Sequence, residues 1–205
     1  MSRIWILAGA LALASATAVA GDAKSRVKSG DAAPDFTLKT LDGKERNLAF
    51  FRGDKKDKIV VVDFWSHACP WSRAWDGELS KIAKDFASKN VVVVAIDSNK
   101  PDKVEDIQKY AKDKSLAFEV FVDADAKVAD AFGGQTTPDI FVIGADGKVR
   151  YTGAVNDMRD PSNPTEFKSS YLRDALEAIA AGKAIAKPDT KNQGCSIKRG
   201  DKAAS

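Results

Sequence analysis

A single cysteine stands where an apolar stretch gives way to a helical pattern. Residues 63–72 read Asp-Phe-Trp-Ser-His-Ala-Cys-Pro-Trp-Ser, so Cys69 comes directly before Pro70. Proline is favoured at the first position of a helix, because its missing N–H would have no partner there. The free N–H groups and the positive end of the helix dipole favour the thiolate, which is the reactive form. The pattern indicates a nucleophilic Cys69, with an inert buried cysteine as the alternative.

Polar and aromatic side chains flank this cysteine. Asp63 closes the apolar stretch six residues earlier. Its carboxyl group either has a raised pKa and relays a proton to or from the sulfur, or is simply solvated. His67 could donate to the thiolate, but a lone loop histidine is more often an exposed polar residue, and we expect that role. Trp71, beside Cys69, is the expected substrate contact, whereas Trp75 falls on the apolar stripe of the helix.

The chain has few other side chains that could take part in catalysis or bind a metal. The chain has two cysteines and one histidine, and no serine lies in a G-x-S-x-G motif. These numbers exclude a disulfide-rich miniprotein and a four-cysteine zinc site, and they argue against a serine hydrolase. His67, Cys69 and Cys195 could ligate copper or zinc, but ligands split between a loop and a tail make a poor preformed site. We therefore expect no metal and no cofactor.

The composition places the chain among ordinary globular proteins. Its 205 residues are 44% hydrophobic and 30% charged, which excludes global disorder and a multi-pass membrane protein. The formal charge is +3, and no basic patch stands out, so nucleic acid is not an expected partner.

The N-terminus has the pattern of an export signal. Arg3 precedes an apolar run over residues 4–13, and a small-residue site, Ala-Val-Ala, ends at Ala20. We expect residues 1–20 to be a signal peptide that is cleaved after Ala20, with a retained membrane anchor as the alternative. The mature protein would then be secreted or periplasmic, without stable membrane insertion, in a compartment where cysteines can pair.

The remaining chain alternates apolar strands with amphipathic helices. We expect residues 21–29 to be a lead-in, residues 30–182 to form one domain, and residues 183–205 to be a flexible polar tail that carries Cys195. Buried strands that alternate with helices predict a βαβ core, and a closing hairpin adds an antiparallel edge. The strands are expected at 36–38, 58–65, 91–96, 118–122, 140–143 and 149–152, and the helices from residue 70 and at 102–114, 125–132 and 167–181.

Several motifs in this order resemble the peroxiredoxin-like (redoxin, or AhpC/TSA) superfamily. They are Gly30 to Leu38, the Leu-Asp-Gly-Lys at 41–44, the Asp-Phe-Trp at 63–65 before Cys69, Thr137-Pro138, the hairpin at 144–153, and the Gly-Cys-Ser-Ile-Lys at 194–198, which is similar to the ending of a secreted subgroup. The resemblance implies an α/β thioredoxin-like fold, in which a central mixed sheet is flanked by helices and carries an N-terminal strand extension. It also implies a cis Thr137-Pro138 bond that faces Cys69, and it matches Asp63 to the buried acid of thioredoxin.

The sequence departs from the family pattern at two points and leaves the position of one family arginine open. Ser72 stands where a thioredoxin-type C-x-x-C motif has its second cysteine. Ser66 matches the Thr or Ser that peroxiredoxins place three residues before the reactive cysteine, but no proline stands seven residues before it. Arg73 and Arg150 are both candidates for the arginine that usually lowers the thiolate pKa.

The resemblance implies a thiol-based oxidoreductase of the cell envelope. Cys69 would attack a protein disulfide or a hydroperoxide, and both reactions require a second thiol. Cys195 is the only internal candidate, and an external thiol would act as reductant. The alternative is a redox-silent binding or stability module in which Cys69 and Cys195 form a permanent disulfide. A metal carrier is a third possibility.

Overall fold

A seven-stranded mixed sheet forms the centre of the molecule. The computed structural model describes residues 25–200, and the strands lie in the order β2-β1-β5-β4-β3-β7-β8. The strands are β1 (Thr37–Thr40), β2 (Glu45–Asn47), β3 (Ile59–Trp65), β4 (Val91–Asp97), β5 (Glu119–Val122), β7 (Ile140–Ile143) and β8 (Val149–Gly153). A separate two-stranded sheet pairs β6 (Thr136–Thr137) with β9 (Cys195–Ser196).

The three central strands are parallel and covered on both faces. β3 pairs with β4, and β4 with β5, in parallel register, while β7 runs antiparallel on the other side of β3. Every residue of β3 is buried. A strand that is covered on both faces needs apolar side chains in both orientations, which explains the continuous Ile-Val-Val-Val run at 59–62.

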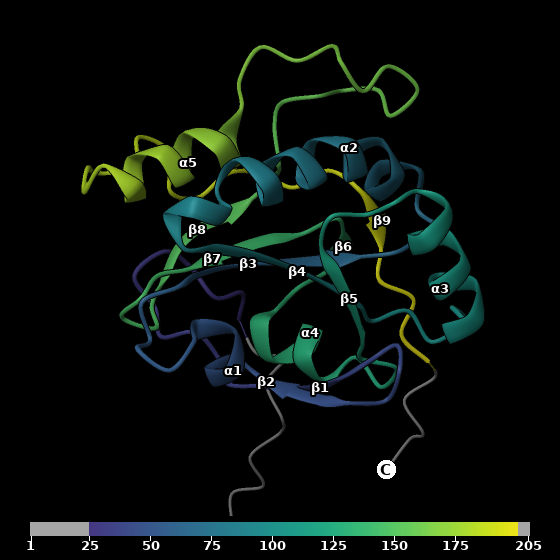
Figure 1. The fold of residues 1–205 in the computed structure, drawn as a ribbon. Coiled ribbons are helices and arrows are strands. Elements are labelled where there is room, and N and C mark those ends of the chain that lie inside the picture. The colour runs from purple at the N-terminus through teal and green to yellow at the C-terminus, as the bar shows by residue number, and fades with distance from the viewer. Residues whose placement is uncertain (1–24, 201–205) are drawn as a thin grey trace, which may run out of the picture.

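Helices cover the two faces of the sheet (Figure 1). On one face, α2 (Pro70–Asp85), α3 (Val104–Asp113) and α5 (Tyr171–Ala180) pack in one hydrophobic cluster with alternate residues of the central strands. On the other face, α1 (Leu48–Arg52) and α4 (Lys127–Phe132) pack in a second cluster. The 3-10 helix η1 (Ala87–Lys89) joins α2 to β4. The βαβ core and the closing hairpin predicted from the sequence are confirmed.

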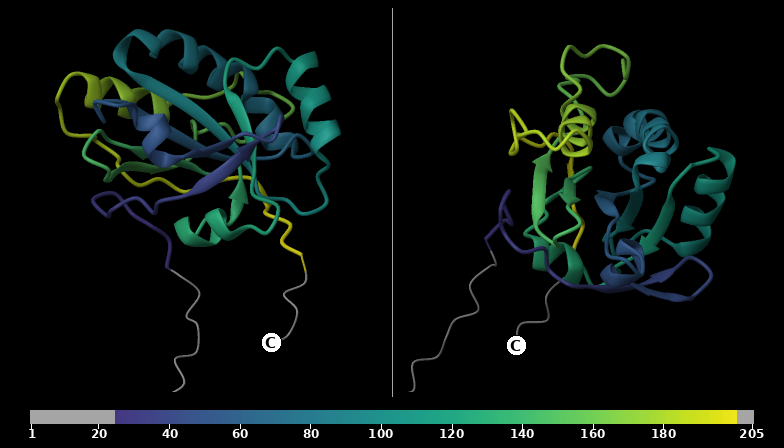
Figure 2. Two further views of the ribbon diagram at one scale, coloured as in Figure 1. Left: turned by 60° about the horizontal axis from the view of Figure 1, so that its bottom comes forward. Right: turned by 60° about the vertical axis from the view of Figure 1, so that its left-hand side comes forward.

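The C-terminal segment differs from the expected flexible tail. Its residues 183–200 run along the domain instead of away from it, as the yellow segment shows in Figure 2. The backbone N–H of Thr152 donates to Pro188, that of Thr190 donates back to Thr152, and that of Ile197 donates to Gln135. The side chain of Ile197 is buried in the cluster that contains α1 and α4. A polar segment without apolar periodicity is therefore held by backbone hydrogen bonds and by one buried apolar side chain.

The expected signal peptide, residues 1–20 with cleavage after Ala20, lies outside the described residues, as do the last residues of the tail, 201–205. Within residues 25–200, no helix combines the length and the apolar character needed to cross a bilayer.

Candidate active site

Cys69 occupies the position expected for a reactive cysteine. It is the N-cap residue of α2, and Pro70 is the first residue of that helix. The strand β3 ends at Trp65, so the loop of residues 66–68 carries the chain from the sheet edge to the helix. The residue is only 4% exposed, which shows that the sulfur is covered in this conformation.

The Thr137-Pro138 peptide bond is cis and lies beside this sulfur, which confirms the prediction. The Cys69 thiol donates to the backbone carbonyl oxygen of Thr137 across 2.9 Å. Thr137 is buried and forms half of the short strand β6.

The second cysteine reaches the same point from the C-terminal segment. β9 pairs antiparallel with β6, and Cys195 lies opposite Thr137 in the register. The two sulfur atoms, of Cys69 and Cys195, are 2.9 Å apart, and both residues are free thiols. The close approach depends on Gly194, because a Cβ atom there would fall on the carbonyl oxygen of Thr137.

The two thiols have opposite pKa shifts. Burial by itself disfavours the Cys69 thiolate, but hydrogen bonds from the side chains of Cys195 and Thr137 and from the backbone N–H of Ser72 outweigh it and lower the pKa of Cys69. Burial and the neighbouring Cys69 sulfur raise the pKa of Cys195 to about 11. The arrangement therefore favours a thiolate on Cys69 that accepts a hydrogen bond from the Cys195 thiol.

Asp63 lies behind the site and is completely buried. Its Oδ1 accepts a hydrogen bond of 3.3 Å from the backbone N–H of Asp139, and its Oδ2 has no hydrogen-bond partner among the described residues. Burial raises the pKa of Asp63 well above its usual value, although the Asp139 N–H opposes this. The interpretation of Asp63 as a solvated strand-end acid is therefore wrong, and the expectation of a raised pKa is confirmed.

Two serines organise the loop before Cys69. The Ser66 hydroxyl donates to Asp102 (2.6 Å) and accepts from the backbone N–H of Ala68, so its hydrogen bonds hold the loop. Ser72 is buried, its hydroxyl accepts from the backbone N–H of Ser66, and its own N–H faces the Cys69 sulfur. The second position of the motif is thus a loop anchor in this protein.

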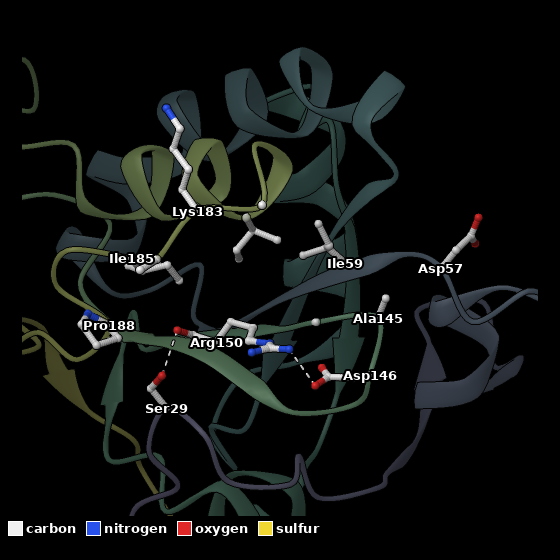
Figure 3. Close-up of a pocket in the computed structure, with 13 residues that line it drawn as sticks. Ser29, Asp57, Ile59, Ala145, Asp146, Arg150, Lys183, Ile185 and Pro188 are labelled. Atoms are coloured by element: carbon white, nitrogen blue, oxygen red, sulfur yellow. Dashed lines mark hydrogen bonds and ion pairs between the residues drawn. The ribbon is translucent and has the colours of Figure 1, made fainter.

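The two candidate arginines are engaged elsewhere. The Arg73 guanidinium lies over the Tyr110 ring, 5.7 Å from its centroid, and is not among the strongest influences on the pKa of Cys69. Arg150 is paired with Asp146 at 2.7 Å. It lines a surface hollow of about 730 Å³ at the start of β3, whereas the cysteine loop follows the end of that strand (Figure 3). Of the two candidates, Arg150 therefore lies away from the cysteine loop.

Trp71 is half-buried and stands next to Trp75, with 5.8 Å between the ring centroids. Trp75 is buried in the core, as its place on the helical stripe predicts, and its indole N–H donates to Asn156. Trp71 thus keeps a partly open face one residue beyond Pro70.

The expectation that His67 is an exposed loop residue is wrong. Its side chain is only 19% exposed, and its Nδ1 lies 3.6 Å from Oδ2 of Asp102 and 4.0 Å from Oδ2 of Asp97. Burial, together with the neighbouring Asp102, raises the pKa of Asp97 to about 8. The position of Asp97 in the sequence could have indicated its place in the site. It ends an apolar strand that runs parallel to the strand before the cysteine loop, and the ends of parallel strands lie at the same edge of a sheet.

The sequence did not reveal one further pair of charged residues beside the site. Arg26, in the expected lead-in, makes a bidentate ion pair of 2.6 Å with Asp139, which directly follows Pro138 and is completely buried. The acid next to the cis proline was a visible signal, but its partner is 113 residues away in the chain.

Comparison with known proteins agrees with this geometry. The model of the AhpC/TSA family matches residues 29–152. The chain belongs to the AhpC/TSA family. The thiol-disulfide oxidoreductase ResA of Geobacillus thermodenitrificans is 28% identical over 127 residues, which are 62% of this chain and 70% of that protein.

Two solved structures are similar over most of the chain. The hypothetical protein SMc02350 of Sinorhizobium meliloti 1021 is 30% identical, with a TM-score of 0.77, over 85% of this chain and 96% of the other. An uncharacterized conserved protein from Geobacillus kaustophilus is 30% identical, with a TM-score of 0.79, over 87% and 96%. Family and fold together identify this AhpC/TSA member as an oxidoreductase of the thioredoxin-like redoxin superfamily.

Proposed function

We propose that the protein is a thiol-disulfide oxidoreductase whose two redox cysteines come from the domain and from the C-terminal segment. Cys69 is the nucleophile, and Cys195 takes the role that Ser72 cannot fill. The observation that supports this most strongly is the 2.9 Å separation of the two sulfur atoms. A disulfide bond requires about 2.05 Å, so only a small approach separates the two thiols from a bond.

The reaction proceeds by two exchanges. The Cys69 thiolate attacks one sulfur of a substrate disulfide, forms a mixed disulfide and releases the other substrate sulfur as a thiolate. The Cys195 sulfur, after losing its proton, then attacks the Cys69 sulfur and releases the second substrate thiolate. The substrate gains two electrons, and the protein keeps a Cys69–Cys195 disulfide. An external thiol reductant returns it to the dithiol state.

Asp63 supports the second exchange in this proposal. The Cys195 thiol must lose a proton to become a nucleophile, and its burial disfavours the thiolate and raises its pKa. The buried carboxylate, whose Oδ2 has no hydrogen-bond partner within residues 25–200, is a base whose raised pKa matches this task. The Asp63 and Cys69 charges also influence each other directly, since the sulfur is one of the groups that raise the pKa of Asp63.

Access for the substrate requires the C-terminal segment to move. β9 occupies the edge of β6 beside Pro138, which is the backbone edge that an extended polypeptide would pair with. A hollow of about 780 Å³ begins at Pro70 and continues along Arg73 to Tyr110 and the loop at 161–164, and it offers space for the rest of a polypeptide substrate. We therefore propose that the segment and the substrate compete for the same edge, with Trp71 at its border.

Disulfide exchange fits the site better than peroxide reduction. The Ser66 hydroxyl, which matches the peroxiredoxin pattern, is bonded to Asp102, and neither candidate arginine is among the strongest influences on the pKa of Cys69. The pattern at 1–20 adds the proposal that the protein works outside the cytoplasm, in the cell envelope.

Stopped-flow kinetics of the reduced protein test the proposed function. We expect rapid reduction of a disulfide dye, slow reaction with hydrogen peroxide, and loss of both reactions in Cys69→Ser. Cys195→Ser should stop at the mixed disulfide and fail to turn over. Undiminished turnover by Cys195→Ser would contradict the proposed pair. A Cys69–Cys195 bond that the glutathione pool cannot reduce would instead support the redox-silent module, because structural disulfides resist that pool.

A further inference from the structure

Three side chains from separate elements meet beside the cysteine loop. His67 lies in the loop before α2, Asp97 is the last residue of β4, and Asp102 lies just before α3. One potential ligand atom from each lies within 4.8 Å of the other two. We propose that His67, Asp97 and Asp102 bind a divalent transition-metal cation, with Zn²⁺ as the best match to their donor atoms.

Two atoms of this group lack hydrogen-bond partners. Asp97 is 1% exposed, and its Oδ1 accepts from the backbone N–H of Asn99 at 2.9 Å. Its Oδ2, like the Nδ1 of His67, is buried and has no hydrogen-bond partner within the described part of the chain. These two atoms are 4.0 Å apart. Buried polar atoms are nearly always bonded, so two unsatisfied atoms this close together, each able to act as a ligand, point to a bound cation.

The spacing suits one small ion. Zinc lies about 2.0–2.2 Å from nitrogen and carboxylate oxygen, so two of its ligands in tetrahedral geometry are about 3.4 Å apart. The Nδ1 of His67 is 3.6 Å from Oδ2 of Asp102 and 4.0 Å from Oδ2 of Asp97, so binding would shorten these two distances by about 0.2 and 0.6 Å. The partial exposure of His67 and Asp102 leaves room for water as the fourth ligand.

The surrounding contacts orient the ligands. Ser66 donates to Asp102 (2.6 Å), and the Asn99 side-chain amide adds a second donor to Oδ1 of Asp97 (3.3 Å). Contacts of this kind fix the direction of metal-ligating carboxylates. One imidazole nitrogen with two carboxylates favours zinc over magnesium, which prefers oxygen ligands alone. This ligand set differs from His67, Cys69 and Cys195, and it does not depend on the redox chemistry proposed above.

Titration of the full chain with Zn²⁺ tests the site, and the Cys69→Ser/Cys195→Ser double variant removes both thiols as competing ligands. We expect this variant to bind one equivalent. His67→Ala and Asp102→Asn in the same background should each weaken binding by more than about a hundredfold, since loss of a supporting contact alone typically costs 10- to 100-fold. Glu105→Gln is the matched control, because it removes an exposed acid of the first turn of α3 outside the group. It should leave the affinity unchanged.

Two further readouts decide between the ligand sets. Co²⁺ bound to the double variant should show the visible absorption of a nitrogen–oxygen site, and circular dichroism should show that His67→Ala stays folded. Binding by the wild type that disappears in the double variant would overturn the proposal in favour of the thiols. Absence of one-to-one binding, or equal affinity in His67→Ala, would overturn it in favour of a proton shared by the three side chains.

Discussion

Removal of the apolar anchor of the C-terminal segment should uncover the Cys69 sulfur. Ile197 is 5% exposed and packs in the hydrophobic cluster under α1 and α4. Truncation of a buried isoleucine to alanine costs about 2–5 kcal/mol, and loss of one methyl group to valine about 0.5–1.5 kcal/mol. A segment at the edge of the core can settle onto the smaller side chain, so the lower part of each range applies.

These free energies set the expected change in accessibility. A tenfold change in an equilibrium corresponds to about 1.4 kcal/mol, so about 2 kcal/mol raises the fraction of undocked segment roughly 30-fold in Ile197→Ala, and about 0.5 kcal/mol raises it roughly twofold in Ile197→Val. The assay is alkylation of reduced protein by a bulky maleimide, with the Cys69 peptide quantified by mass spectrometry. Each rate is divided by the thiolate fraction from the pH profile of that variant, because undocking also removes the hydrogen bond from Cys195.

Ile185→Ala is the matched control. Ile185 belongs to the same C-terminal segment but packs on the opposite hydrophobic cluster, the one with α5. We expect the rates to rise in the order wild type, Ile197→Val, Ile197→Ala, with Ile185→Ala close to wild type. Equal rates in all four proteins would refute the inference that the docked segment limits access to the sulfur.

Three other perturbations test parts of the site. Replacement of Cys195 by alanine should raise the pKa of Cys69, whereas replacement by serine, which keeps a hydrogen-bond donor, should raise it less. The pH profile of iodoacetamide alkylation of Cys69 measures this pKa. Identical profiles in the wild type and both variants would contradict the shared hydrogen bond. Asp63→Asn should stabilise the protein increasingly above pH about 4, by about 1.4 kcal/mol for each pH unit up to the folded pKa. The reason is that burial raises the pKa of Asp63 in the folded state, so the free energy of unfolding of the wild type falls as the pH rises from about 4 to that pKa. Denaturant unfolding at several pH values measures this, and a stability difference between Asp63→Asn and the wild type that does not change with pH would contradict it. Gly194→Ala should undock the segment and speed Cys69 alkylation, because its Cβ would fall on a backbone carbonyl oxygen of β6, while Gly77→Ala, which meets open space, should not.

The sequence predicts the central architecture because the signals are local. The apolar run at 59–62 and the helical stripe from Trp75 to Phe86 identify a covered strand and the helix that covers it. The short helix α1 has five residues, which is too few for a periodic pattern to be recognised.

The docked C-terminal segment could not be predicted in this way. Its fold depends on the buried side chain of Ile197, on the partly buried Ile185 and on backbone hydrogen bonds to distant strands, which leave no periodic pattern in a polar stretch. The resemblance placed Cys195 near Cys69 only as a possibility, and the register of β9 against β6 supplies the contact.

The pairing of the charged residues behind and beside the site also could not be predicted from the sequence. Arg26 meets Asp139 across 113 residues, and His67 meets two acids that are 30 and 35 residues later. Each partner is an ordinary charged residue in its local context. Only the parallel pairing of β3 with β4 brings the end of the second strand to the cysteine loop.

The most direct test of the central claim is the product of oxidation. Reduced wild-type protein is given one equivalent of a small disulfide oxidant, quenched, and analysed by peptide mapping. We predict an intramolecular Cys69–Cys195 disulfide that dithiothreitol and an excess of glutathione both reduce, and in Cys195→Ser a mixed disulfide on Cys69 alone. Recovery of Cys195 as a free thiol while the wild type turns over at its full rate would contradict the account.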